Sequence, residues 1–455
     1  MKKYKKTLTV ISILVVAVIM FTSFFGIYKK NENGEKMSLL ADYNLGMEFE
    51  NSKVITMDVS QEIIETIYDA EGNEIVEKEE GVEYTEEAGY KIVGEPVNPD
   101  SVKTQENYRK TKKIITERLK KCGVSEFLVE LDENTGKIKI QIPDDSNAEE
   151  VESIIKSSGS LMLMDGQTFD LVYDSSNLDK ATVMYSQGEL ETAVFLQLEF
   201  NENGKNKLNE LLTAYATPEQ TEGEEEVTEK TVIVLLNNQF LGSVAPANIV
   251  YDNKIMLTLG VSNDNAELQK AAKEAEKHAV LLNTGSIALE YEYGEETKDP
   301  EISQRQLLTA LGAAGAIFLI AYVLLVIKFK AKGFISVYFQ VGFLAILLLV
   351  LRLTNVLINM EGIIGITISM ILDLIFTYII LTNIEKEEEK VYNISAKEFF
   401  IKTIPFLVIA IVCTFATRAY ISSFGETLFW GILMIYVYNF MFSKFVFENL
   451  TKASK

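Results

Sequence analysis

One acidic side chain, Asp373, lies close to the midpoint of an apolar run that covers residues 362–381. A helix of about 20 apolar residues is long enough to cross a bilayer, and a carboxylate at its centre costs roughly 2.5–3.5 kcal/mol on insertion scales. We therefore expect this carboxylate to face protein or water, where it could bind and release a proton. The alternative is a hydrogen bond that only packs one helix against another.

Small and hydroxyl-bearing residues recur around this acid at intervals of four. Gly365, Ser369, Asp373 and Thr377 therefore share one face of the expected helix. Small residues let a neighbouring helix approach, and hydroxyl groups can hydrogen-bond a carboxyl group in either protonation state. The pattern predicts Asp373 as the proton carrier, with Ser369 and Thr377 as hydrogen-bonding neighbours and with Gly362 and Gly365 as helix-packing positions.

The composition describes two unlike parts of one chain. The net charge is -22 although 48% of the residues are hydrophobic, and most acids fall outside the apolar runs. This pattern indicates a membrane protein with an acidic soluble domain, and it disfavours nucleic acid as a partner because like charges repel. Cys122 and Cys413 suggest neither a disulfide framework nor a metal site. His278 is the only histidine and is expected on the surface, so zinc catalysis and Ser-His-Asp hydrolysis are poorly supported, and no cofactor is expected.

The first apolar run predicts a membrane anchor within residues 1–30. Four lysines precede the run, which covers residues 8–27 and exceeds the 7–15 residues of a signal-peptide core. No small-residue cleavage site follows it, so we expect the anchor to be retained. The positive-inside rule places the amino terminus in the cytosol, and the segment after the anchor is then outside the cytosol.

Residues 31–303 contain no further spanning run and form the expected extracytoplasmic α+β domain. Helical patterns at 105–122 and 148–157 flank strand patterns at 127–131 and 137–142, which is typical of a ferredoxin-like unit. A second mixture of strands and helices predicts two subdomains, of about 38–190 and 191–303. Two acidic inserts, at 69–100 and 218–230, are expected to be solvated loops.

The spans return after Ser303. Apolar runs at 307–327, 334–351, 362–381, 399–417 and 428–445 predict a five-span block at 304–447, followed by a cytosolic tail at 448–455. With the anchor this makes six spans and two cytosolic termini. Arg352 and Arg418 lie near the outer ends of their spans, where long side chains reach for the interface. A weaker hypothesis is that Arg418 lines a proton route to Asp373.

Several segments, taken in order, resemble the SecD/SecF family of protein-translocase membrane subunits. The exported region carries six of them: Asn44-Leu45-Gly46-Met47-Glu48, Arg118 with Gly123-Val124, Lys139-Ile140-Gln141-Ile142-Pro143, Phe200 to Gly204, Ile233-Val234-Leu235 with Pro246, and Leu282 to Ala288. The segment Ser369 to Ile375 resembles the family's span with the intramembrane acid, although Ile375 stands where the family has asparagine. Gly425, Thr427, Leu428 and Gly431 resemble a degraded form of the motif in the family's last span.

This resemblance implies one half of a membrane domain of the resistance-nodulation-division transporter group. It implies a SecF-like second half, the Sec channel, unfolded preproteins and the lipid bilayer as partners. The implied function is a SecD-like subunit of the preprotein translocase, in the bacterial cytoplasmic membrane, that uses a proton or sodium gradient to assist late steps of export.

Three other classes were weighed against this hypothesis. An intramembrane aspartyl protease needs two carboxylates that share a proton, and the expected spans contain a single aspartate. A small-molecule or lipid exporter of the same group would carry two halves in one chain or self-associate. A scaffold or sensor that transports nothing remains as the third alternative, and it would tolerate Asp373→Asn.

Overall fold

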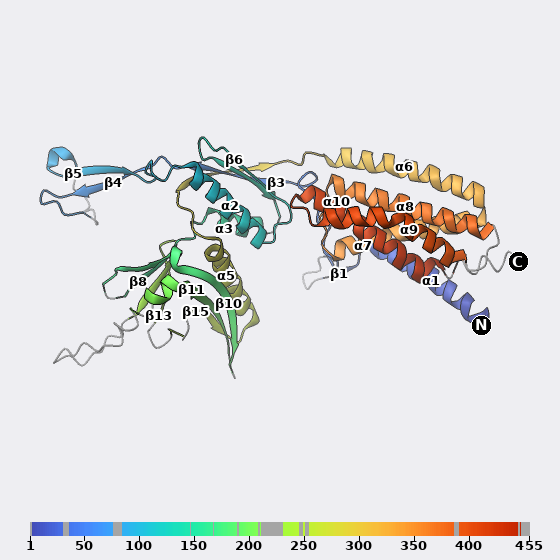
Figure 1. Cartoon of the computed structure of the whole chain (residues 1–455), viewed down its shortest axis with the longest axis horizontal. Coiled ribbons are helices and arrows are strands. Elements are labelled where there is room, and N and C mark those ends of the chain that lie inside the picture. The colour runs from blue at the N-terminus through green and yellow to red at the C-terminus, as the bar shows by residue number, and fades with distance from the viewer. Residues whose placement is uncertain are drawn as a thin grey trace. The chain divides into compact units, whose positions relative to one another are not determined.

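We describe a computed structural model of the chain, in which two compact units are seen (Figure 1). The described residues are 2–30, 36–75, 84–145, 147–166, 168–188, 191–207, 210, 231–244, 249–250, 254–385, 391–444 and 446. The first unit comprises Met1–Ser52 and Lys298–Lys455, and the second comprises Lys53–Thr297. Each unit is described by itself.

The first unit is helical. Its helices are α1 (Lys2–Phe25), α6 (Gln304–Phe329), α7 (Ala331–Leu353), α8 (Met360–Glu385), α9 (Val391–Thr414) and α10 (Ala419–Tyr438), followed by a π-helical turn, η4 (Asn439–Ser443). Within the described residues, four stretches are long and apolar enough to cross a membrane: Gln304–Phe329, Ala331–Leu353, Met360–Asn383 and Ala419–Ser443. The apolar part of α1 that meets the same test is shorter, Val10–Phe25, and α9 contains Pro405.

The last helix differs from the expectation, because it begins at Ala419 rather than at residue 428. The first two turns of α10 contain polar side chains that obscured the apolar pattern. These side chains are bonded within the unit: Ser422 donates to Glu426 Oε1 at 2.9 Å, and Ser423 donates to Leu357 O at 2.7 Å. A polar group satisfied inside the protein does not interrupt a helix at membrane depth.

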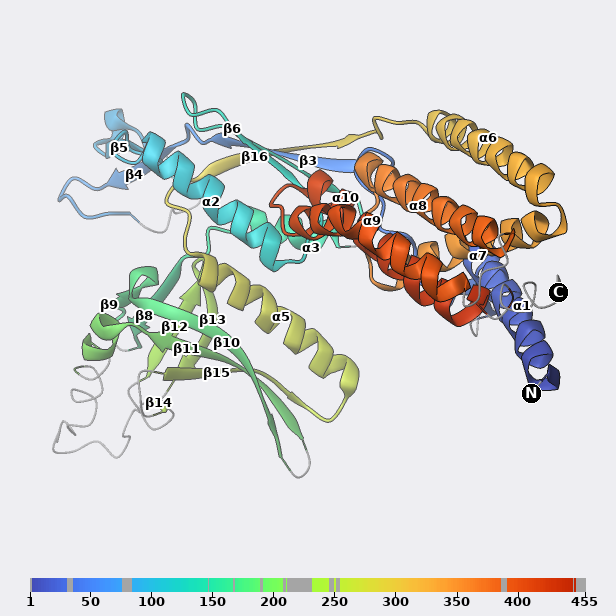
Figure 2. The ribbon, with the colours of Figure 1, turned by 45° about the vertical axis from the view of Figure 1, so that its right-hand side comes forward.

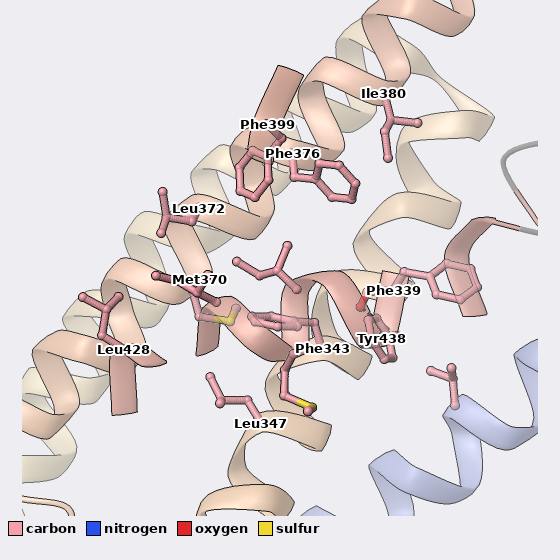
Figure 3. Packing of buried hydrophobic residues seen from close by; sticks show 14 of the residues in the cluster. Phe339, Phe343, Leu347, Met370, Leu372, Phe376, Ile380, Phe399, Leu428 and Tyr438 are labelled. Carbon is pink, nitrogen blue, oxygen red and sulfur yellow. Dashed lines mark hydrogen bonds between the residues drawn. The ribbon is translucent and has the colours of Figure 1, made fainter. Parts of the chain in front are cut away.

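Helices α7, α8, α9 and α10 share one hydrophobic core, and α1 packs against α7. Aromatic side chains fill its centre (Figure 3): Phe376 of α8 contacts Phe399 of α9 with ring centroids 4.9 Å apart, and Phe343 of α7 contacts Tyr438 at 6.2 Å. The Tyr438 hydroxyl also donates to Phe339 O at 3.0 Å. These contacts fix α8 against α9 and α10 against α7.

The second unit begins with a four-stranded sheet covered by two helices. Its elements follow one another as β3 (Ser52–Val59), α2 (Gln105–Lys121), β6 (Leu128–Leu131), β7 (Ile138–Pro143), α3 (Ala148–Lys156) and β16 (Tyr291–Lys298). The sheet order is β16-β3-β7-β6. Strand β7 alternates buried and exposed residues, and its isoleucines pack on the buried faces of α2 and α3. A half-buried sheet needs this alternation.

Two further four-stranded sheets share a second core in the same unit. One has the order β10-β11-β15-β14, from Leu178–Gln187, Thr192–Phe200, Lys254–Ser262 and Ile249–Val250. The other has the order β13-β12-β8-β9, from Gln239–Val244, Val232–Leu236, Leu161–Asp165 and Leu171–Asp174. Helix α5 (Asn265–Thr284) lies along β10, β11 and β15 (Figure 2).

The expected subdomain boundary at residues 190–191 does not separate these sheets. Strand β10 lies before the boundary and pairs with β11 after it, and β8 likewise pairs with β12. The core that holds these strands therefore runs from Ile154 to Leu282, and the chain returns to the first sheet through β16. Sequence order misplaces the boundary because strand pairing joins residues far apart in the chain.

The first acidic insert is more than a loop. Strand β4 (Ile63–Tyr68) pairs antiparallel with β5 (Lys91–Pro96), so the insert at 69–100 includes one strand of a ribbon. In the first unit a smaller ribbon pairs β1 (Tyr28–Lys30) with β2 (Lys36–Ser38). The insert at 218–230 and the tail at 448–455 lie outside the described residues.

Candidate functional site

Asp373 lies in the middle of α8, and side chains from α7 and η4 contact it. Its side chain is 1% exposed. Gln340 of α7 donates its Nε2–H to Asp373 Oδ2 at 2.6 Å, and Asn439 of η4 donates its Nδ2–H to Asp373 Oδ1 at 2.7 Å. Each carboxylate oxygen therefore accepts one amide hydrogen bond. Such charge-assisted bonds offset part of the cost of burying the carboxylate.

The hydrogen bonds continue on both sides of the acid. Gln340 Nε2 also donates to Thr377 Oγ1 at 2.8 Å, which joins Thr377 to Asp373 through one amide. On the other side, Ser443 Oγ donates to Asn439 Oδ1 at 2.6 Å. The network thus links α8 to α7 and to η4, and both amides direct their donors toward Asp373.

A local change of helix geometry presents Asn439. The α-helical pattern of α10 ends at Tyr438 and widens into the π-helical turn η4. Asn439 Nδ2 still reaches back to Ile435 O at 2.8 Å, so the amide is held by its own helix as well as by Asp373. Short π-helical turns inside helices are frequent at functional sites.

The small residues on the same face of α8 let α10 approach closely. A Cβ atom at Gly362 would lie 2.5 Å from Ser423 Oγ, and one at Gly365 would clash with the Thr427 hydroxyl and lie 2.9 Å from a backbone oxygen. Ser369 is fully buried, and it donates to Gly365 O at 2.9 Å rather than to Asp373. Ser369 thus lies in the seam between α8 and α10.

Arg418 is separate from this network. It is the N-cap residue of α10, it is exposed, and its side chain makes no capping hydrogen bond. In the described part of the chain, no hydrogen bond or ion pair joins Arg418 to Asp373. The structure therefore brings together Asp373 and Thr377, places Ser369 one turn away, and leaves Arg418 at the junction of α9 and α10.

The two residues that donate hydrogen bonds to Asp373, Gln340 and Asn439, were not predicted from the sequence. Gln340 and Asn439 each interrupt an apolar run, as Asp373 does, and this polar interruption is the signal that could have identified them. A second acid, Glu426 of α10, was also missed because the helix was expected to begin after it.

The first turn of α8 is tied to the segment that follows the anchor. Ile358 N donates to Asn44 O at 2.8 Å, and Met360 N donates to Glu48 Oε2 at 3.1 Å. Glu48 O accepts from Ile302 N at 2.8 Å, just before α6. Burial raises the pKa of Glu48, and the charges of Glu361 and Glu301 add to this, whereas the bond from Met360 opposes it. Glu48 therefore connects the start of α8 to the chain leading into α6.

Arg352 fastens the same segment to α7. Its guanidinium donates to the Ala41 and Leu40 carbonyl oxygens and lies 5.1 Å from the centroid of the Tyr43 ring. Arg352 therefore has defined contacts at the end of α7, and its reach toward a membrane interface stays a prediction.

In the second unit, a buried arginine joins the two sheet systems. Arg118 of α2 is 0% exposed, and its five N–H groups meet five acceptors: Thr284 Oγ1 and the carbonyl oxygens of Ile154, Ser157, Ser158 and Gly285. Burial lowers the pKa of Arg118 to about 10, which leaves it charged at neutral pH. These acceptors lie where the chain leaves the first sheet and where it returns.

His278 is less exposed than expected. It is half-buried on α5, its Nδ1 has no hydrogen-bond partner, and burial lowers its pKa. The side chain lines a cavity of about 840 Å³ together with Asn237, Phe240 and Glu274. Within the described residues, no group of three His, Cys, Asp or Glu side chains could hold a metal ion, and Cys122 and Cys413 are free thiols.

Comparison with solved structures identifies the fold. A crystal structure of SecDF in its super-membrane-facing form matches with a TM-score of 0.65 at 14% identity, and the match covers 100% of this chain and 58% of that one. SecDF from Thermus thermophilus, described as a translocon-associated membrane protein, matches with a TM-score of 0.45 at 14% identity, over 98% of this chain and 59% of that one.

The first of these matches shows that this chain has a SecDF fold along its whole length. The chain spans less than two thirds of the length of the SecDF chains that it matches. No protein-family model and no curated protein sequence matches it.

Proposed function

We propose that this chain is a SecD-like membrane subunit that uses an ion gradient, of protons or of sodium ions, to assist late steps of protein export. The observation that carries the proposal is the buried Asp373, held by two amides inside a fold that matches SecDF over the whole chain. An acid that a protein buries among membrane-length helices is expected to have a function.

The coupling would start at Asp373 and pass along α8. Binding and release of an ion changes the charge inside the helical unit, and one charge that crosses about 100 mV gains about 2.3 kcal/mol. That energy is enough to bias a two-state equilibrium by roughly fiftyfold. The first turn of α8 is bonded to Glu48, and the Glu48 carbonyl is bonded to the chain before α6. A shift of α8 would therefore reach both chain segments that lead to the second unit.

The proposed topology has six spans, with α1 and α9 added to the four membrane-length stretches. Lys328, Lys330 and Lys332 lie at the turn between α6 and α7, and the positive-inside rule places this turn in the cytosol. Both termini then lie in the cytosol, and the second unit lies on the extracytoplasmic side of the cytoplasmic membrane. The element order β3-α2-β6-β7-α3-β16 supports a ferredoxin-like assignment for its first sheet.

The proposed partners are a SecF-like membrane half, the Sec channel, unfolded preproteins and the lipid bilayer. Helix α6 supports the bilayer and a second membrane half as partners, because only 6% of its apolar stretch is buried. Its exposed side chains include Leu308, Ile317, Leu324 and Ile327. An apolar surface of this kind fits lipid or a second membrane half.

Export of a reporter preprotein tests the proposal. Cells that depend on this protein would carry wild-type chain, Asp373→Asn or Glu426→Gln, each shown by immunoblot to reach the membrane equally. Asp373→Asn keeps the size of the side chain and removes the titrating proton. We expect export to fail with Asp373→Asn and to persist with Glu426→Gln. Normal export with Asp373→Asn would refute ion coupling at this residue and would favour the scaffold alternative.

A further inference from the structure

The two amides that hold Asp373 differ in one respect. Asn439 Oδ1 is occupied, because it accepts from Ser443 Oγ at 2.6 Å. Gln340 Oε1 is buried and has no hydrogen-bond partner, although Gln340 is only 1% exposed. The carboxylate therefore lies beside one amide with a vacant acceptor and one amide without.

A vacant acceptor in this place matches a change in the chemistry of the acid. An ionised carboxylate only accepts hydrogen bonds, whereas a protonated carboxyl group also carries one O–H donor. That donor needs an acceptor, since a buried polar group without a partner is costly. The Gln340 amide can supply one if it turns by 180° about its last side-chain bond, which exchanges its oxygen and nitrogen.

The same turn is costly for Asn439. Its amide is fixed by three bonds, to Asp373 Oδ1, Ile435 O and Ser443 Oγ, and a turn would break all of them. Gln340 would exchange two donated bonds for two accepted ones, because the Thr377 hydroxyl can donate as well as accept, and its N–H groups would move to the position where Oε1 now has no partner. Only one of the two amides is therefore free to follow the acid.

We propose that Gln340 is a positioning residue that follows the protonation state of Asp373, while Asn439 keeps one orientation. Gln340 donates Nε2–H to the carboxylate, and it turns to accept the carboxyl proton through Oε1 when Asp373 is protonated. The only covalent bond that changes is the O–H bond of Asp373, whose proton comes from the aqueous phase. The inference rests on the proposed function, in which Asp373 binds and releases a proton.

Few other titratable groups face the site. Tyr322 of α6 and Tyr438 of α10 interact electrostatically with Asp373. Gln340 and Asn439 are the groups that hydrogen-bond to it from α7 and η4. Among the residues that the structure describes, no lysine or arginine pairs with Asp373. The response of the site to pH is thus expected to come from Asp373 itself.

Infrared difference spectroscopy tests the turn directly in the wild-type full-length chain. The chain would be reconstituted in phospholipid nanodiscs, with either glutamine or asparagine side-chain amides isotopically labelled, and compared at acidic and alkaline pH. Asp373→Asn identifies the Asp373 carboxyl band, and Gln340→Met identifies the Gln340 amide band. We expect the Gln340 band to shift together with the appearance of the carboxyl band, and the labelled asparagine bands to stay unchanged.

Two variants of matched shape add a quantitative test. Gln340→Met removes a group that bonds both forms of the acid, so the pH midpoint of the carboxyl band should move by less than about half a unit. Asn439→Leu removes a donor whose bond to the carboxylate is stronger than its bond to the neutral carboxyl group, so the midpoint should rise by about one to two units. Equal shifts in the two variants would overturn the proposal.

Two other outcomes would also overturn it: a carboxyl band that appears while the Gln340 band stays fixed, or a labelled asparagine band that shifts. The labelled wild-type chain gives an answer even if a variant fails to fold. The export assay is independent of this measurement. If the Gln340 amide turns but Asp373→Asn still exports, the proposed function fails and the positioning role stands.

Discussion

Replacing Arg118 with methionine should weaken the second unit where its two sheet systems join. Methionine fills a similar volume but offers no N–H group, so four backbone carbonyl oxygens and the Thr284 hydroxyl each lose one donor, and of these oxygens Ser158 O keeps the bond from Ile287 N. The space cannot be refilled from nearby, because Gly159 lies against the guanidinium at a φ of +74°, where other residues are strained. Water could replace the donors only if the junction opened.

The expected loss of stability follows from the number of orphaned acceptors. Each buried polar group without a partner costs about 1–3 kcal/mol, and removal of one member of a buried charged network typically costs about 3–5 kcal/mol. We expect Arg118→Met to lower the free energy of unfolding of this junction by about 3–5 kcal/mol rather than by the sum over all five acceptors, because Thr284 keeps its own donated bonds to Val280 O and Leu281 O. This corresponds to a roughly 150- to 5,000-fold loss of protection against amide exchange.

Hydrogen exchange on the full-length chain in nanodiscs would measure this loss at the last turns of α3 and α5. The matched control is Arg109→Met on the same helix, because Arg109 is exposed and forms a surface ion pair with Glu133. Surface pairs contribute about 0–1 kcal/mol, so the control should change little. If Arg118→Met loses no more protection than Arg109→Met, the structural role argued for Arg118 is wrong.

Three other predictions follow from the described contacts. Gly365→Leu should lower the thermal unfolding temperature of the chain in nanodiscs by several degrees, because the leucine side chain would clash with α10. The control Gly312→Leu should leave this temperature unchanged, because the space around Gly312 is open. Equal unfolding temperatures of the two variants would contradict the close packing of α8 and α10. Burial raises the pKa of Cys122 from 9.0 to about 11, so less thiolate is present at any pH below 9. Alkylation of Cys122, measured in a chain in which Cys413 is replaced by serine, should therefore be roughly a hundredfold slower than alkylation of a free thiol. A rate like that of free cysteine would refute the burial of Cys122. Glu48→Ala should increase amide exchange at Met360, which loses its acceptor, and Glu48→Gln should restore protection; identical exchange in both would show that the bond contributes nothing.

The sequence alone located the acid and the four stretches that are long and apolar enough to cross a membrane, although it placed the start of the last stretch too late. Apolar runs report helix position directly, because every residue that faces lipid must be apolar and a span has a fixed length. Asp373 stood out for the same reason, as a charge where none is tolerated without a purpose. The alternation in β7 and the helical spacing in α2 also predicted elements that the structure contains. These are local signals, which a single stretch of chain carries.

Neither the partners of the acid nor the boundaries of the sheets could be obtained this way. Gln340 and Asn439 lie 33 and 66 residues from Asp373, and only helix packing brings their amides to its two oxygens. Strands β8 and β12 pair across a comparable distance, which moved the subdomain boundary. Hydrogen bonds between distant residues depend on crossing angles, register and helix rotation, and these are set when the whole core packs. The sequence therefore determined which residue carries the charge, and the tertiary structure decided which groups hold it.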